Sequence, residues 1–302
     1  MPRGGGTSNG GVIGKTNNTS FGNCVQTVKT SSGTVTTQSG TRVVQALVVA
    51  GGGGGAGGGG GAGGLVNQEV NVCGSTPYTV TIGAGGNFGA DPGSGGPVAS
   101  NGSNSVFGST TACGGGKGAR NNAGHPSAPS VPLTDASPGG SGGGAARTSG
   151  TNNDGGTAVS GQGNPGGDFV YGGPPGSVSP ANASSAGGGG AGSAGSSFTA
   201  NAATPGGNGL DVSSDFPGAP NCGVYAGGGG GGAFCTPSAP GGGGSGGVGT
   251  PPSTPGSTAG STNTGGGGGG GQGTFGWGNG ANGGSGIVIV KELITAIDRD
   301  WS

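Results

Sequence analysis

One short motif in this chain looks like a nucleotide site. Gly14, Lys15 and Thr16 match the end of a phosphate-binding loop. The first glycine of that loop would fall on Asn9, no apolar strand precedes it, and no amphipathic helix follows. We therefore predict no nucleotide site here and no bound cofactor.

Acid–base residues are equally sparse. His125 is the only histidine, so a catalytic triad would have to combine it with Asp135 or Asp154. Asp211 and Asp215 are close in sequence, but paired-carboxylate chemistry needs a rigid cleft, and this stretch has the composition of a loop. We predict a protein that is not an enzyme.

The five cysteines are odd in number and widely spaced, at positions 24, 73, 113, 222 and 235. None forms a CxxC pair, so the spacing does not predict a metal or redox site. Cys222 and Cys235 flank one glycine run and are candidates for a disulfide bond. Free thiols are the alternative, and synthesis in a cytoplasm favours them.

The composition excludes an ordinary globular core. Glycine accounts for 91 of 302 residues, apolar residues for 27% and charged residues for 6%. An average domain has about 7% glycine and about 25% charged residues. A formal net charge of −1 gives no basic patch for nucleic acid, and no apolar run is long enough to span a membrane.

Strand-like sequence lies mainly towards the two ends of the chain, at residues 24–28, 34–37, 43–50, 70–72, 78–82 and 287–290. Between residues 83 and 286, glycine clusters alternate with Pro- and Ser-rich segments, without the three-residue glycine period of collagen. Neighbouring segments that carry only glycine let backbones approach closely enough to hydrogen-bond. The fold class we expect is mostly irregular: a bundle of packed glycine-rich polyproline-II helices on a small β-strand base, with almost no α-helix. A disordered low-complexity chain is the alternative.

The order of these pieces resembles a known family. It comprises Leu47–Ala50 before a glycine run, the strand 78–82, the segment 102–108, and a glycine run from 265 that leads into Ile287–Val290. This order resembles the glycine-rich domain of bacteriophage tail-fibre and adhesin proteins, including the fibre-tip adhesins of T-even-type phages. The resemblance implies attachment to a virion and recognition of a host-cell receptor through variable loops.

The resemblance and the composition together suggest three regions. Residues 1–42 form an N-terminal attachment or assembly region, and residues 43–290 form the glycine-rich bundle. Residues 291–302 form a C-terminal tail in which Leu293, Ile297 and Trp301 share one face of a short docking helix; a frayed terminus is the alternative.

Loops presented by a rigid scaffold are where binding is expected, and aromatic side chains supply contact area at low entropy cost. The candidate receptor contacts are Phe169, Tyr171, Phe216, His125, Asn121 and Asn122. The alternative for the aromatic residues is that they cap the end of the bundle.

The expected partners are a host cell-surface protein or glycan, other virion or fibre proteins, and a further copy of this chain. The N-terminus lacks the apolar stretch of a secretory signal, so we expect synthesis in the host cytoplasm and residence on the virion. The alternative is a structural virion or extracellular filament protein that self-assembles through its glycine-rich bundle.

Overall fold

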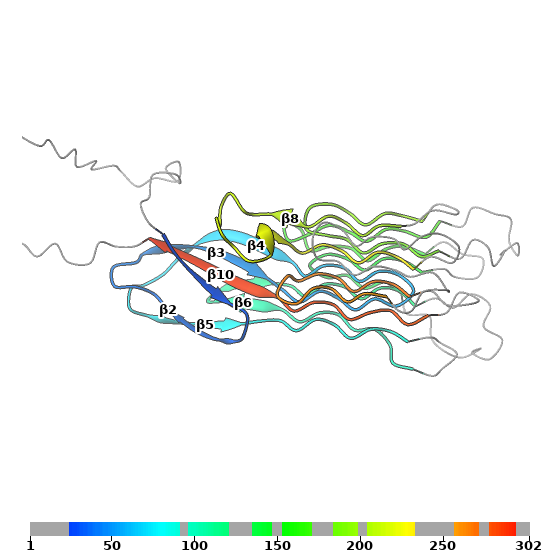
Figure 1. Ribbon diagram of the computed structural model, residues 1–302, viewed down its shortest axis with the longest axis horizontal. Helices are drawn as coiled ribbons and strands as arrows, with labels where there is room; N and C mark the ends of the chain where they lie inside the picture. The colour runs from blue at the N-terminus through cyan, green and yellow to red at the C-terminus, as the bar shows by residue number, and fades with distance from the viewer. Residues whose placement is uncertain are drawn as a thin grey trace, which may run out of the picture.

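The computed structural model describes residues 24–90, 96–120, 135–146, 153–170, 184–198, 204–232, 257–271 and 278–293. The molecule is elongated: antiparallel sheets lie at one end, and glycine-rich segments run side by side from them towards the other end (Figure 1).

Two four-stranded antiparallel sheets build the first end. Sheet A has the order β1 (Cys24–Lys29), β10 (Ile287–Leu293), β3 (Val43–Val49) and β4 (Leu65–Asn71). Sheet B has the order β2 (Gly33–Thr36), β5 (Pro77–Thr81), β6 (Ser105–Phe107) and β7 (Thr110–Ala112). A short third sheet pairs β8 (Leu210–Asp211) with β9 (Val224–Tyr225).

Sheet A is buried on both faces. Along β3, Val44, Ala46 and Val48 face a cluster shared with sheet B that includes Val80 and Phe107. Leu47 and Val49 point the other way, into a cluster with Ile287 and Ile289 that also contains Val212, Phe216 and Tyr225. A strand buried on both faces reads as a continuous apolar run rather than an alternating one.

A strap covers that second face of sheet A. We use this name for residues 210–226, which contain β8, a 3-10 turn (Asn221–Gly223) and β9. Asn67 on β4 donates to the Asp215 carboxylate over 2.7 Å, and the Lys291 ammonium on β10 donates to the Asp215 carbonyl over 2.7 Å. Gln26 on β1 donates to the Pro217 carbonyl over 2.9 Å. The strap is thus bonded to three strands of the sheet that it covers.

Outside the strands, the glycine-rich segments form a backbone-bonded array, which we call the glycine array. Its centre is a hairpin, residues 50–64, that leaves β3 and returns to β4. On its outgoing arm, the amide of Gly51 bonds to Ser103, that of Gly52 to Gly284 and that of Gly53 to Gly61, over 2.8–3.0 Å. The next two amides return to the first two partner segments. Gly54 bonds to Ser100 and Gly55 to Ala281, in each case three residues before the earlier partner in the sequence.

The returning arm keeps the same period. Amides of residues 58, 61 and 64 bond to the segment 113–119, those of 59 and 62 to the segment 186–189, and those of 60 and 63 to the segment 265–268. Each inner segment therefore bonds to neighbours in three directions, and every third residue returns to the same neighbour. In a β-sheet these backbone groups would bond to the adjacent strands. Here they bond to three neighbouring segments in turn, so that successive amides point in three different directions.

Glycine is required because the neighbours are so close. A Cβ atom on Gly53 would lie well inside the contact distance of the Gly116 carbonyl oxygen, and one on Gly60 would overlap that of Gly53. The same holds through the array, and the obstacle is almost always backbone rather than a movable side chain. The expectation that glycine lets bare backbones approach and bond is confirmed.

The expected fold class is wrong in the share that it gives to β-sheet. The described residues form ten strands in several antiparallel sheets, so the fold is β-rich and the sheets are a substantial part of it, not a small base. The near absence of helix agrees with the expectation, since the described residues contain one 3-10 turn and no α-helix. The sequence reading undercounted strands because it relied on apolar runs, whereas β4 contains Asn67, Gln68 and Glu69.

Residues from both of the expected flanking regions, 1–42 and 291–302, also belong to the sheets. β1 pairs with β10, and β2 pairs with β5, so residues 24–36 are integral to both sheets. Lys291–Leu293 continue β10 as a strand. Residues 1–23 and 294–302 lie outside the described part of the chain.

Candidate functional site

Chain positions that flank several internal undescribed segments meet at the end of the molecule opposite the sheets (Figure 1). The hairpin turns at residues 56–58, where the Ala56 amide donates to the Gly58 carbonyl over 3.0 Å. Around this turn, the Gly57 amide donates to Ala119, and the Gly57 and Ala56 carbonyls accept from Gly232 and Gly271. The described segments that end near residues 120, 232 and 271 therefore end beside one turn.

A second group of segment ends lies next to the first. The Ala145 amide donates to Gly167 over 3.0 Å, and the Ala186 amide donates to Ala145 over 2.8 Å. Gly59 donates to Ala186, which connects this group to the central hairpin. These backbone bonds bring segment ends from between residues 119 and 271 together at one end of the molecule.

Phe169 lies in this second group but is buried. It is 3% exposed and stacks on Phe198, with ring centroids 4.9 Å apart and an interplanar angle of 18°. Its backbone exchanges two hydrogen bonds with Asn153, over 2.8 and 3.0 Å. As placed, Phe169 holds three segment ends together and offers no surface to a partner.

Phe216 is not at this end at all. It is fully buried under the strap, against sheet A. The structure therefore does not bring Phe169 and Phe216 together, and we correct the expectation that Phe216 is a receptor contact: it is a core residue. Tyr171, His125, Asn121 and Asn122 lie outside the described residues.

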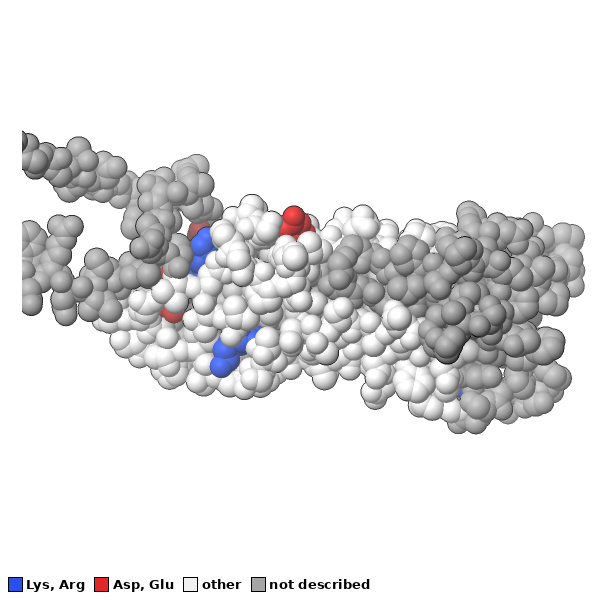
Figure 2. Space-filling model, in the orientation of Figure 1, with Lys and Arg blue, Asp and Glu red and all other residues white. Residues whose placement is uncertain are grey.

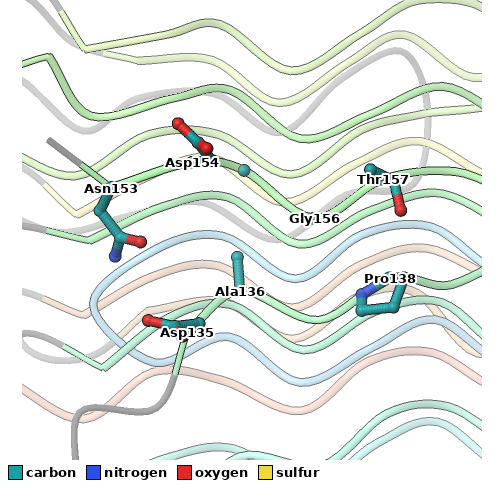
Figure 3. Close-up of a pocket in the computed structure, with 8 residues that line it drawn as sticks. Asp135, Ala136, Pro138, Asn153, Asp154, Gly156 and Thr157 are labelled. Atoms are coloured by element: carbon teal, nitrogen blue, oxygen red, sulfur yellow. The ribbon is translucent and has the colours of Figure 1, made fainter.

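A shallow depression of about 380 Å³ lies between two outer segments near this end (Figure 3). Its lining includes Asp135, Asn153, Asp154 and Thr157, and both carboxylates are exposed. The side-chain amide of Asn153 donates a hydrogen bond to the Ala146 carbonyl over 3.3 Å. The depression can accept hydrogen bonds from a polar ligand, but its exposed carboxylates lack the rigid enclosure that acid–base chemistry needs.

Asp211 and Asp215 have structural roles. Asp211 accepts hydrogen bonds from the side chain and the backbone amide of Ser213, and these bonds lower the pKa of its carboxyl group. Asp215 accepts from Asn67, as described above. Neither is part of a paired-carboxylate site.

The candidate assembly residues are described only in part. Leu293 ends β10 opposite Cys24 at the start of β1, so the two ends of the described chain lie side by side. The neighbouring Glu292 carboxylate is buried and accepts from the Gln38 amide over 2.9 Å and from the Thr41 hydroxyl over 3.0 Å. Ile297 and Trp301 lie outside the described residues, as do Gly14, Lys15 and Thr16.

Cys73, Cys113 and Cys222 carry free thiols. In the part of the chain that the structure describes, no group of three or more His, Cys, Asp and Glu residues lies close enough to hold a metal ion. Within the same ranges, no helix is long and apolar enough to cross a bilayer. Charged side chains are few and scattered on the face shown in Figure 2, most of them over the sheets.

Sequence reasoning missed two features of this end. Phe198, the stacking partner of Phe169, stands alone among Ser and Thr and gives no signal. The turn at the centre of the end coincides with Ala56, one of the two alanines that interrupt the glycine run of residues 51–64, but Ala62 lies within the returning arm, so alanine alone does not identify the turn.

Comparison with known proteins places the chain in a family. No curated protein matches it. A family model described as a glycine-rich domain matches residues 26–292, which covers sheet B, the strap, the glycine array and all of sheet A except the outermost residues of β1 and β10. The chain therefore belongs to the glycine-rich domain family.

Proposed function

We propose that this chain is a receptor-binding adhesin of a bacteriophage virion, a tail-fibre or fibre-tip protein that contacts a host-cell protein or glycan with the end opposite its sheets. The observation that carries the proposal is the separation of two ends. Cys24 and Leu293 pair at the sheet end, whereas the segments that flank residues 121–134 and 233–256 meet around the 56–58 turn. Attachment at one end leaves the other available to a receptor.

The glycine array supports this role because it is a stiff spacer. Its segments are cross-bonded in three directions by backbone groups, so the far end is held in a fixed position relative to the sheets. A rigid scaffold that presents variable connections is a common arrangement for recognition. The resemblance to tail-fibre adhesins points the same way.

The test replaces the connections at the far end and measures binding to cells. Residues 121–134, which contain Asn121, Asn122 and His125, are exchanged for a Gly/Ser segment of equal length, and in a second variant residues 171–183 are exchanged. We expect either variant to lose at least about tenfold in binding of labelled protein to susceptible bacterial cells, with the melting temperature unchanged. The matched control is Val43→Ser, at an exposed position (42%) in the sheets, which should bind normally.

The rival is a self-assembling structural protein. It predicts that both exchanged variants bind cells as well as the parent does, or that the parent does not bind at all. Either result would remove the adhesin proposal.

A further inference from the structure

In the outer segments of the glycine array, some backbone amides face away from every neighbouring chain, which does not occur in the described inner segments. An inner segment finds a neighbouring chain in each of three directions, but a segment at the surface lacks one in at least one direction. Its outward-facing amides then need another acceptor or water.

Segment 113–120 shows how the missing neighbour is replaced. Amides of Gly115 and Gly118 donate to the central hairpin, and those of Gly116 and Ala119 donate to the segment 141–144. The third set, Gly114 and Lys117, bonds to no backbone carbonyl and instead faces side chains of the adjacent segment 100–104. The Gly114 amide donates to the Asn104 side-chain oxygen over 2.8 Å, and the Lys117 amide donates to the Asn101 side-chain oxygen over 3.0 Å.

The spacing of these asparagines matches the array. Asn101 and Asn104 are three residues apart, as are the amides they accept from, and both side chains are exposed. An asparagine carbonyl has the same chemistry as a backbone carbonyl. The two side chains therefore stand where the carbonyls of a further extended chain would otherwise lie.

Other surface segments repeat the arrangement. Asn282 accepts from the Phe88 amide over 2.8 Å, and Ser100 accepts from the Asn87 amide over 2.9 Å. Asp168 accepts from the Gly155 amide over 2.8 Å, and Ser197 accepts from the Asp168 amide over 3.0 Å. The acceptors in these pairs are short Asn, Ser or Asp side chains, and the longer Gln162 side chain does the same for the Cys113 amide over 2.8 Å.

We infer that these Asn, Ser and Asp side chains form a lateral cap that ends the glycine array, in the way that N-cap side chains end a helix. The cap fills the outward hydrogen-bonding positions that another glycine-rich chain would use. It limits the array to one molecule and keeps the flank of the rod from adding a second copy.

Hydrogen exchange at two amides tests the cap. Asn104→Ala should speed exchange at the Gly114 amide at least about tenfold and leave Lys117 unchanged, and Asn101→Ala should do the reverse. Asn104→Asp keeps an acceptor oxygen and should restore protection at Gly114. The control is Asn87→Ala: this exposed asparagine has no side-chain hydrogen bond among the described residues, and its loss should leave both amides unchanged.

Each alanine variant should speed exchange at one amide only, and the two variants should affect different amides. General destabilisation would instead speed exchange at both amides in every variant. If Gly114 and Lys117 exchange at parental rates in the alanine variants, or if both accelerate equally, the cap is overturned.

Sedimentation velocity tests the lateral limit. The double variant Asn101→Gly and Asn104→Gly exposes two adjacent amides on one flank, and we expect it to self-associate more strongly than the parent at the same concentration. If its association matches that of the parent while exchange at the two amides is faster, the side chains cap the amides but do not limit assembly, and that part of the inference fails.

Discussion

At the scale of single residues, glycine positions in this protein differ sharply in what they tolerate. Gly53 lies in the central hairpin, where an added Cβ would overlap the backbone of Gly116. Gly33 lies in β2, where the nearest atom to an added Cβ is the tip of the Lys29 side chain, 3.6 Å away. The same substitution therefore has opposite consequences at the two sites.

We expect Gly53→Ala to lower the free energy of unfolding by at least about 2 kcal/mol, because the obstacle is backbone that cannot move aside. Gly33→Ala should be neutral or stabilise by up to about 1 kcal/mol, since alanine loses less freedom than glycine on folding. Denaturant unfolding of both variants measures this. Equal destabilisation at the two positions would contradict the close-approach explanation.

Tyr225 gives a pH dependence with a defined sign. Its buried hydroxyl group donates to the Pro220 carbonyl over 2.6 Å, and burial raises its pKa to about 12. Tyrosine in an unfolded chain ionises near pH 10, so between about pH 10 and 12 the folded state holds the proton more tightly than the unfolded state does. This contribution to stability is complete below pH 10 and is lost as the pH rises through that window.

Tyr225→Phe should remove that loss. The variant should be less stable by about 1 kcal/mol at neutral pH, because the Pro220 carbonyl loses its donor, yet its melting temperature should fall less steeply than that of the parent between pH 10 and 12. Thermal melts at intervals across this range provide the comparison. Parallel curves for the two proteins would show that Tyr225 does not titrate as described.

At the scale of elements, the strap decides whether sheet A has one covered face or two. Phe216 is its central side chain, fully buried against Leu47 and Ile289, and the Lys291 ammonium lies 6.0 Å from its ring centroid. Phe216→Ala should lower the free energy of unfolding by about 3–5 kcal/mol, as expected for removing a buried aromatic ring. Phe88→Ala, at a half-buried position in an outer segment, is the control and should cost clearly less in the same denaturant titration.

The elements also show how far the sequence alone could lead. Strands β1, β2, β3, β5 and β10 could be predicted from Val- and Thr-rich runs, to within a residue or two for most ends. β6 and β7 are three residues each and are fixed by pairing with β5 and with each other rather than by their own pattern. Strand β4 has only two apolar residues, Leu65 and Val66, between the glycine run and the polar stretch Asn67–Glu69, so only its last residues were predicted.

The candidate site was less predictable than the sheets. Glycine content indicated close backbone packing, but which segments are neighbours depends on pairings across the whole chain, such as Gly52 with Gly284. The burial of Phe216 could not be predicted either, because the strap has the composition of a loop and becomes a core element only through contact with sheet A. Local sequence does not contain that information.

At the scale of the whole molecule, the glycine array and the sheets form one bonded unit. The central hairpin is the direct continuation of β3 and β4, and its amides and carbonyls bond to described segments spread between residues 86 and 284. Opening the hairpin requires those segments to separate. We therefore expect the array to unfold together with the sheets.

Native-state hydrogen exchange in increasing denaturant tests this. Amides of residues 51–64 should exchange with the same free energy and the same denaturant dependence as those of Val44–Val48 in β3, because both open only in global unfolding. If the hairpin amides exchange at a lower free energy than those of β3, the array is a separate and weaker unit.

The three-residue rotation of hydrogen bonds has a consequence for how such chains can change over time. Removing one residue from a glycine-rich segment would turn every later amide towards the wrong neighbour, whereas removing three would shorten the segment and keep each direction in place. Length variation inside the array is thus restricted to triplets, much as a coding sequence must keep its frame. The connections between segments are exempt from this restriction, so they can lengthen, shorten and diversify while the rod beneath them stays the same.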